Sequence, residues 1–471
     1  MLSHTDVTNL GNVLVLGFGR TGFGVVEYLA DQLGKRVTAI SLYGGASSKP
    51  SDRTHEFEAR GVHVVCGSDE VEGSYDLAIV SPGIPPTSDF FVSAREHAAE
   101  LIGEPEFAWR ESPENWVAIT GTNGKTTTTL LATALLRAGG LDALAVGNVG
   151  VLATGEVAAR RSEDTWFVAE LSSFQLATTR LLHTRVGCLL NISPDHLEWH
   201  GSLEAYALAK ERLFDNFDEN DLAIVSCDDS WCRQSIDRLT ARGLRVCSVS
   251  VHDIPDTHNA AFVRNHRLVV RRDGREYELV NQGSLPIRGE HNVQNALVAA
   301  ALALELGVTP NAVCHGLLAF EPLAHRIEPC GELGKIRFVN DSKATNVDSV
   351  RKALTAFEPG EVVILLGGHD KGTELGSLAA SVVDVCRVAV CYGEAGPRIA
   401  TALRAENRHH RLTVVEATHL ADAFEKAVEL ARPKDVVLLS PACSSFDEFS
   451  SFEERGAVFK SLVARLGKED A

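Results

Sequence analysis

Short apolar runs alternate with longer segments of mixed polarity along most of the chain. In many of these segments the apolar residues recur at helical spacing. The clearest runs are 12–16, 77–80, 116–119, 166–169, 186–192, 336–340, 362–366 and 436–439. The alternation predicts an α/β fold with mostly parallel sheets. Polar residues directly after such strands meet at one edge of a sheet, where ligands bind.

The chain has 471 residues, which is more than one hydrophobic core usually supports. We expect three domains: a Rossmann-like domain at 1–102, a central phosphate-loop ATPase-like domain at 103–322, and a Rossmann-like domain at 323–471. The connector from Pro322 to Arg326 marks the last boundary, because a proline opens it and strand–helix alternation resumes after it.

The strongest chemical signal follows the run 116–119, and it reads Gly121-Thr122-Asn123-Gly124-Lys125-Thr126-Thr127. The two glycines allow positive φ angles and a close approach of backbone N–H groups to phosphates. Lys125 supplies a cation for the outer phosphates and Thr126 a hydroxyl for magnesium. Position 119 is isoleucine, so the full G-x-x-x-x-G-K-[ST] pattern is absent. The stretch nevertheless predicts a nucleoside triphosphate site.

A second glycine-rich turn, 17–22, follows the first apolar run and matches G-x-G-x-x-G. The next strand, 36–41, lacks the acid that would bind a nicotinamide dinucleotide's ribose. The turn therefore favours the diphosphate of another nucleotide, such as a sugar nucleotide. Ser81, Pro82 and Gly83 follow the strand 77–80 at the corresponding edge, although a plain turn explains Ser81 equally well.

Three more polar residues follow strands of the central segment: Asn148, Glu170 and His196. A carboxylate at a strand end beside a phosphate loop is suited to hold magnesium. For Glu170 the alternative is a helix cap or a salt bridge, and a lone histidine is more often structural.

Lys210 falls inside an apolar stripe of the helical segment 202–217, with Tyr206, Ala207, Leu213 and Phe214 as its neighbours at three and four residues. A buried ammonium is costly unless it is paired or neutralised. Lys210 therefore either extends past the edge of the stripe or carries an amine that is chemically modified or contacts phosphate.

Asn292 and Asn295 lie three residues apart near the start of a long Ala/Leu helix, where they suit the amide edges of a base. The alternative for Asn292 is an N-cap. In the last segment, polar and cationic groups follow three strands, at 341–346, 367–372 and 440–445. They predict a site for an anionic substrate.

Composition narrows the function further. The net charge of −18 excludes a general nucleic-acid or anionic-membrane binder. No apolar run reaches the roughly 20 residues that a membrane span needs. No signal peptide is evident, so we expect a cytoplasmic protein whose ten cysteines are reduced thiols rather than zinc ligands. We also expect a monomer.

Several motifs together resemble the Mur ligases of peptidoglycan synthesis, and the last two resemble the members that add D-glutamate. They are 121–126, Glu170-Leu171-Ser172-Ser173-Phe174-Gln175, 289–295, His325-Arg326, 340–346 and 440–449. The resemblance covers nearly the whole chain. It implies ATP-dependent ligation of D-glutamate to UDP-N-acetylmuramoyl-L-alanine through an acyl phosphate.

The resemblance also implies a role for each matching residue. Lys125, His196 and Lys210 would be catalytic, and Lys210 would be carbamylated. Two magnesium ions would be held by Thr126, Glu170, His196 and Lys210. ATP would contact Gly121, Thr122, Asn123, Gly124, Lys125, Thr126, Thr127, Asn292, Asn295, Arg326 and Asp341. The UDP substrate would contact Arg20, Thr21, Ser81, Pro82, Gly83, Asn148 and Lys343, and D-glutamate would contact Thr345, Lys371, Ser445 and Phe452.

One stretch, Ser41-Leu42-Tyr43-Gly44-Gly45, departs from the family's usual Asp-Thr-Arg-like end to the second strand. The uracil contacts there are therefore not predicted. Within the same class, the alternatives are another Mur ligase or a folylpolyglutamate synthetase. Outside it they are a phosphate-loop ATPase or kinase without ligation, and a nicotinamide dehydrogenase.

Overall fold

The computed structural model describes residues 9–148, 151–160, 162–321 and 324–469. Its strands form three sheets of five, nine and six strands, which confirms the α/β fold with mostly parallel pairing. By compactness the chain divides into two units, one of 1–280 with 295–316 and the other of 281–294 with 317–471. The domain boundaries at 102 and 322 remain predictions.

The first sheet has the strand order β3-β2-β1-β4-β5. Its elements are β1 (Gly11–Leu16), α1 (Arg20–Ala30), β2 (Val37–Tyr43), α2 (Asp52–Ala59), β3 (His63–Val65), β4 (Leu77–Val80), α3 (Asp89–His97) and β5 (Leu101–Gly103). Alternate residues of β1 pack against α1 and α2 on one face and against α3 on the other. Both faces are covered, which explains why the strands are continuous apolar runs.

The nine-stranded sheet has the order β14-β13-β12-β11-β10-β9-β6-β8-β7. Its strands are β6 (Trp116–Thr120), β7 (Ala143–Gly147), β8 (Trp166–Glu170), β9 (Val186–Leu189), β10 (Leu222–Ser226), β11 (Arg245–Ser250), β12 (Asn259–Arg264), β13 (Arg267–Arg272) and β14 (Arg275–Asn281). Strands β6, β7, β8 and β9 are parallel neighbours, so their carboxyl ends share one edge. The hairpin β13–β14 turns at Asp273 and Gly274, whose φ angles are 49° and 78°, as the Asp-Gly pair requires.

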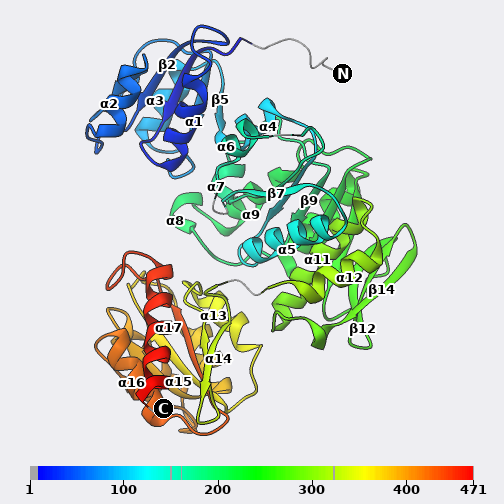
Figure 1. Ribbon diagram of the computed structural model, residues 1–471, viewed down its shortest axis with the longest axis vertical. Helices are drawn as coiled ribbons and strands as arrows, with labels where there is room; N and C mark the ends of the chain where they lie inside the picture. Colours follow the sequence, from blue (N-terminus) through cyan, green and yellow to red (C-terminus); the bar gives the residue numbers. More distant parts are fainter. Residues whose placement is uncertain (1–8, 149–150, 161, 322–323, 470–471) are drawn as a thin grey trace. The chain divides into compact units, whose positions relative to one another are not determined.

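The helices of this segment are α4 (Glu104–Glu111), α5 (Lys125–Ala138), α6 (Ala153–Ala158), α7 (Ser173–Leu176), α8 (Leu197–His200), α9 (Leu203–Glu211), α10 (Ser230–Ala241), α11 (Glu290–Glu305) and α12 (Pro310–Ala319), with short 3-10 turns at Arg212–Phe214 and Gln282–Ser284. Helix α5 packs along β7 and β8 (Figure 1). Ser202 caps α9 by accepting a hydrogen bond from the Ala205 amide at 3.1 Å.

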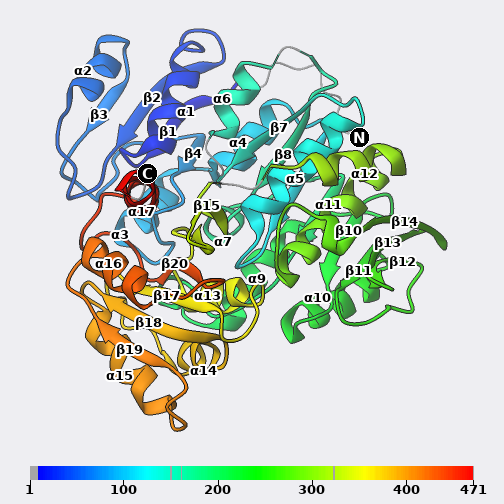
Figure 2. The ribbon, with the colours of Figure 1, turned by 60° about the horizontal axis from the view of Figure 1, so that its bottom comes forward.

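The six-stranded sheet has the order β15-β16-β20-β17-β18-β19 (Figure 2). Its elements are β15 (Glu328–Leu333), β16 (Ile336–Asn340), α13 (Val347–Leu354), β17 (Val362–Gly367), α14 (Gly376–Val385), β18 (Cys386–Tyr392), α15 (Gly396–Glu406), β19 (Thr413–Glu416), α16 (Leu420–Leu430), β20 (Val436–Ala442) and α17 (Phe452–Glu469). Helices α13, α14 and α15 cover one face, whereas α16 and α17 cover the other. The fold of this segment is thus doubly wound, as the sequence predicts.

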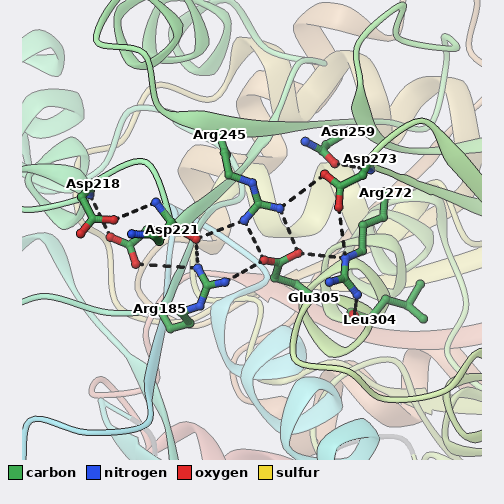
Figure 3. A network of polar contacts seen from close by, with 10 residues as sticks. Arg185, Asp218, Asp221, Arg245, Asn259, Arg272, Asp273, Leu304 and Glu305 are labelled. Atoms are coloured by element: carbon green, nitrogen blue, oxygen red, sulfur yellow. Dashed lines mark hydrogen bonds and ion pairs between the residues drawn. The ribbon is translucent and has the colours of Figure 1, made fainter.

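An ion-pair network joins the amino-terminal ends of β9, β10 and β11 to the last turn of α11 (Figure 3). Glu305 accepts hydrogen bonds from Arg185 at 3.2 Å and Arg245 at 2.8 Å, and it also pairs with Arg272 at 3.2 Å. Its side chain is 2% exposed, and the three arginines offset the cost of burying its negative charge. The network lies at the sheet edge opposite to the one that carries the glycine-rich loop after β6.

His183 and Asp221 belong to the same end of the sheet, with 2.6 Å between His183 Nε2 and Asp221 Oδ2. The hydrogen bond to Asp221 raises the pKa of His183. The stabilisation is therefore complete below the unfolded pKa of about 6.5 and is lost as pH rises through the higher folded pKa. We expect His183→Asn to lower the urea midpoint more at about pH 5.5 than at about pH 9.

The matched control is His409→Asn, because His409 is exposed. It should leave the urea midpoint unchanged at both pH values. An equal loss for His183→Asn at both pH values would contradict the charged pair.

Within the described residues no helix is both long and apolar enough to cross a membrane.

Candidate active site

The glycine-rich loop 121–124 joins β6 to α5, as the sequence predicts. Gly121 has a φ of 152° and Gly124 a φ of 84°, both strained for other residues. A side chain at Gly124 would also lie 2.5 Å from Asn295 Oδ1. The loop therefore needs glycine at both positions, and it leads directly into the N-terminus of α5, where anions bind.

Asn191, on the loop after β9, braces the glycine-rich loop. Its backbone oxygen accepts from the Thr122 amide at 2.9 Å, and its Oδ1 accepts from the Asn123 amide at 2.9 Å. Its Nδ2 returns a hydrogen bond to the Asn123 carbonyl at 3.0 Å. The apolar run 186–192 predicts that Asn191 lies inside a strand, so its contacts with the glycine-rich loop are not predicted. Its position directly after a strand that neighbours β6 was the available signal.

Lys125 begins α5 and folds back over the loop. Its Nζ donates to the carbonyl oxygens of Gly121 at 2.9 Å and Thr122 at 2.8 Å. Thr126 beside it is half-buried, whereas Thr127 is buried. The ammonium therefore lies against the loop's own backbone, within the site where phosphate oxygens would compete with these carbonyls.

Glu170 ends β8 and is 2% exposed. Its Oε1 accepts from Asn148 Nδ2 at 3.1 Å, so these two predicted residues are brought together. Its Oε2 is buried and has no hydrogen-bond partner among the described residues. A buried carboxylate oxygen without a donor is costly unless a cation completes it, so the residues present fit a magnesium ion.

Lys210 is 1% exposed, so it does not extend past the edge of its stripe to solvent. Its Nζ donates to the Gly121 carbonyl at 2.8 Å and lies 4.6 Å from the centre of the Tyr206 ring. Burial, with a contribution from the nearby Lys125 charge, lowers the pKa of Lys210 well below its usual range. A lowered pKa favours the neutral form of the amine, which is the form that reacts with electrophiles.

Tyr206, on the apolar face of α9, also makes a polar contact with the glycine-rich loop. Its hydroxyl donates to Thr122 Oγ1 at 3.1 Å. The same Oγ1 accepts from the Ser193 amide at 2.9 Å. Helix α9 thus contacts the glycine-rich loop through Tyr206 and Lys210. For Tyr206, the apolar periodicity of the helix predicts only an apolar contact.

His196 lies on the loop after β9 with a φ of 52°, and its side chain is 48% exposed. Its Nε2 lies 3.6 Å from Asp195 Oδ2, and its ring centre lies 4.7 Å from that of Phe174. The predicted metal partners Glu170 and Lys210 are both buried, whereas His196 is not. The structure thus places all three at one sheet edge without joining His196 to the other two.

His200, four residues on, packs against the same aromatic ring at 5.6 Å. Burial, aided by the charge of Lys210, lowers the pKa of His200 to about 4. The neutral ring lies 2.9 Å from the Ser173 hydroxyl, within hydrogen-bonding distance. His200 therefore orients the loop after β8 rather than contributing charge.

The two asparagines of α11 have different hydrogen-bond partners. Asn295 is 2% exposed, and its Oδ1 accepts from Thr128 Oγ1 at 3.1 Å, beside the glycine-rich loop. Helix α11 begins at Glu290, so Asn292 lies inside its first turn, where its Nδ2 donates to the Arg288 carbonyl at 2.7 Å. The alternative reading of Asn292 as an N-cap is therefore wrong.

The first sheet brings the predicted UDP-side residues to the carboxyl ends of β1 and β4, which are adjacent and parallel. A side chain at Gly17 would lie 2.7 Å from Ser81 Oγ, and one at Gly22 would lie 1.9 Å from the Gly17 carbonyl. Ser81 Oγ is buried and has no partner among the described residues. Arg20 opens α1 and is exposed. This arrangement explains the glycine spacing of the turn and leaves a hydroxyl for a ligand.

In the second unit, the loops after β16, β20 and β17 share one edge because these strands are parallel neighbours. Lys371 Nζ donates to the Thr345 carbonyl at 3.3 Å. Asp341 Oδ2 accepts from Ser440 Oγ at 2.7 Å, and burial raises the pKa of Asp341 to about 7. Ser445 is 2% exposed, and Phe452 opens α17. Arg326 and Asn292 belong to the same unit.

Among the described residues, one group of histidine and carboxylate side chains is close enough to hold a metal: His183, Asp218 and Asp221. It lies in the ion-pair network described above, and His183 is already hydrogen-bonded to Asp221. The cluster is therefore a structural contact rather than the metal site that the sequence predicts.

Two family models match the chain: the Mur ligase middle domain over residues 119–303, and the Mur ligase, glutamate ligase domain over 325–443. The UDP-N-acetylmuramoylalanine--D-glutamate ligase of Pelotomaculum thermopropionicum is 36% identical and aligns over 97% of this chain and 98% of its own. The chain belongs to this ligase family. The enzyme of the same name from Koribacter versatilis is 35% identical over the same 97% and 98% shares.

Solved Mur-type ligases share the fold of this family. MurF from Acinetobacter baumannii superposes with a TM-score of 0.61 at 18% identity, covering 90% of each chain. A pseudomurein peptide ligase from Methanothermus fervidus gives 0.59 at 17% identity, covering 97% of this chain and 99% of its own. The predictions of a three-domain α/β fold and of an ATP-dependent ligase of peptidoglycan synthesis are confirmed. The nicotinamide dehydrogenase and the simple phosphate-loop kinase are not supported.

Proposed function

We propose that this ligase joins D-glutamate to UDP-N-acetylmuramoyl-L-alanine at the expense of ATP, using the residues assembled at the carboxyl edges of its sheets. The observation that carries the site assignment is the cluster around the glycine-rich loop. There, Lys125 follows β6 and the buried Glu170 carboxylate ends its parallel neighbour β8, while the buried Lys210 amine on α9 donates to the Gly121 carbonyl. Cytoplasmic location and a monomeric state remain predictions.

The loop amides and Lys125 would hold the ATP phosphates, and Thr126 with Glu170 would hold magnesium, which neutralises charge on the transferred phosphoryl group. The alanyl carboxylate of the UDP substrate would attack the γ-phosphorus. An O–P bond forms, the bond to the β-bridging oxygen breaks, and ADP leaves. The D-glutamate amine would then attack the acyl carbon and release phosphate. Positioning accounts for most of this catalysis.

Lys210 would carry a carbamate. Its neutral amine attacks carbon dioxide, forms an N–C bond and gives one proton to solvent. The product is an anion, which converts a buried cation-forming group into a ligand for the second magnesium together with His196. The burial of Lys210 and the lowered pKa support this proposal.

In the remaining assignments, Asn295, Asn292, Arg326 and Asp341 would bind the nucleoside of ATP and its phosphates. Arg20, Thr21, Ser81, Pro82, Gly83, Asn148 and Lys343 would bind the UDP substrate. Thr345, Lys371, Ser445 and Phe452 would bind D-glutamate, with Lys371 pairing with a carboxylate.

The decisive experiment is a phosphate-release assay with the UDP substrate and one amino acid at a time. We expect release with D-glutamate and at least about 100-fold less with L-glutamate, L-alanine or meso-diaminopimelate, because a polar site rejects substrates that leave its groups unpaired. Release that is indifferent to both the UDP substrate and the amino acid would overturn the proposal. A preference for another amino acid would indicate a different Mur ligase.

A further inference from the structure

The first turn of α17 connects side chains that the proposed function assigns to two different substrates. Lys343, assigned to the UDP substrate, follows β16, whereas Phe452, assigned to D-glutamate, opens α17. Lys343 Nζ lies 3.7 Å from the centre of the Phe452 ring. Both side chains are half-buried, so the contact is only partly screened by water.

The backbone around this contact is held on both sides. Ser342 Oγ donates to the Phe452 carbonyl at 2.9 Å, which attaches α17 to the loop after β16. On the other side, the Lys343 amide donates to the His325 carbonyl at 3.1 Å, and the His325 ring meets Phe452 edge-on at 6.1 Å. The ring therefore presents a fixed face to the ammonium.

Arg455, one turn further along α17, strengthens the same attachment. It is fully buried, and its Nε and Nη2 donate to Ser342 Oγ and Ser342 O, both at 2.9 Å. Its Nη1 donates to the carbonyls of Cys443 at 3.1 Å and Ser444 at 3.2 Å. A side chain at Gly368 would lie 3.0 Å from this nitrogen, so the loop after β17 is packed against it too. All three strand-end loops thus contact the start of α17.

We propose that Phe452 is a positioning residue for the UDP substrate as well as a neighbour of D-glutamate, because its ring holds the Lys343 ammonium in place. A lysine side chain loses rotamer entropy when it is ordered, and the ring confines it before substrate arrives. Preordering of this kind strengthens binding without a new contact to the ligand. The inference rests on the proposed assignment of Lys343.

The test compares Phe452→Leu with Phe452→Tyr and measures KM for each substrate separately. Leucine removes the aromatic face, so KM for UDP-N-acetylmuramoyl-L-alanine should rise about 3- to 10-fold. Tyrosine keeps the face and should restore KM to within about 2-fold. KM for ATP should not change. Phe357→Leu is the matched control, since Phe357 is a half-buried ring packed on the core of the same unit.

A double-mutant cycle with Lys343→Met isolates the contact. If the ring acts through Lys343, adding Phe452→Leu to Lys343→Met should not raise KM for the UDP substrate further. Additive increases in the cycle, or a rise in KM for D-glutamate alone, would overturn the inference. If Lys343→Met leaves KM for the UDP substrate unchanged, the inference fails together with that assignment. The proposed function would still be supported in that case if phosphate release requires D-glutamate.

Discussion

Lys125→Met is expected to lower kcat for D-glutamate-dependent phosphate release by about 1,000-fold, the scale found when one transition-state charge donor is removed. Lys125 Nζ already lies against the loop carbonyls of Gly121 and Thr122, at the position where charge on the outer phosphates would develop. Methionine keeps the length and apolar stem of the side chain and removes only the charge, so the loop should keep its fold. Initial rates at saturating substrates measure the loss.

Lys35→Met is the matched control for this substitution, because Lys35 is exposed and donates to the backbone carbonyl of Asp31. It should leave kcat unchanged. A Lys125→Met enzyme that retained more than about a tenth of wild-type kcat would show that another group stabilises the phosphoryl transfer.

Lys210→Met should be comparably inactive, with a loss of about 100- to 1,000-fold, although the substitution adds no buried charge. The native amine is buried and contacts Gly121 and Tyr206, so methionine fills the same space among apolar neighbours. Thermal stability should therefore be unchanged or higher while activity is lost. A loss of activity without a loss of thermal stability indicates that Lys210 has a chemical role rather than a structural one.

The chemical state of Lys210 can be observed without an activity assay. Enzyme equilibrated with labelled bicarbonate, magnesium and nucleotide should show one carbamate resonance by carbon NMR, and Lys210→Met should lack it. Absence of the resonance from an active, magnesium-loaded wild-type enzyme would remove the carbamate from the mechanism, and the buried amine would then need another explanation.

The sequence predicted the parts of the site that depend on local chemistry. The glycines of the 121–124 loop, the positions of Glu170 and His196 after strands, and the place of Lys210 inside an apolar stripe all follow from spacing alone. Lys210 was the most informative, because a cation inside an apolar stripe conflicts with the rest of its helix. Such conflicts between local pattern and residue type tend to mark functional positions.

The contacts between distant segments could not be predicted in the same way. Asn191 braces Asn123, Tyr206 donates to Thr122, and Arg455 joins loops that precede it by up to 113 residues. Each of these residues looks ordinary in its own segment, since an asparagine after a strand or an arginine in a helix has many uses. Only the order of the strands in the sheets decides which loops become neighbours.

The arginines around Glu305 lie at the sheet edge opposite to the glycine-rich loop. Arg185 and Arg245 lie at the amino ends of β9 and β11, and Arg272 lies at the carboxyl end of β13, which runs antiparallel to β12. Substitutions at this edge should change how much folded enzyme a cell maintains, since a loss of 1–2 kcal/mol can alter abundance several-fold. The turnover of each surviving molecule should stay the same. Natural variation at this edge would thus change the amount of folded enzyme. Variation at the opposite edge would change the rate of the reaction that each molecule catalyses.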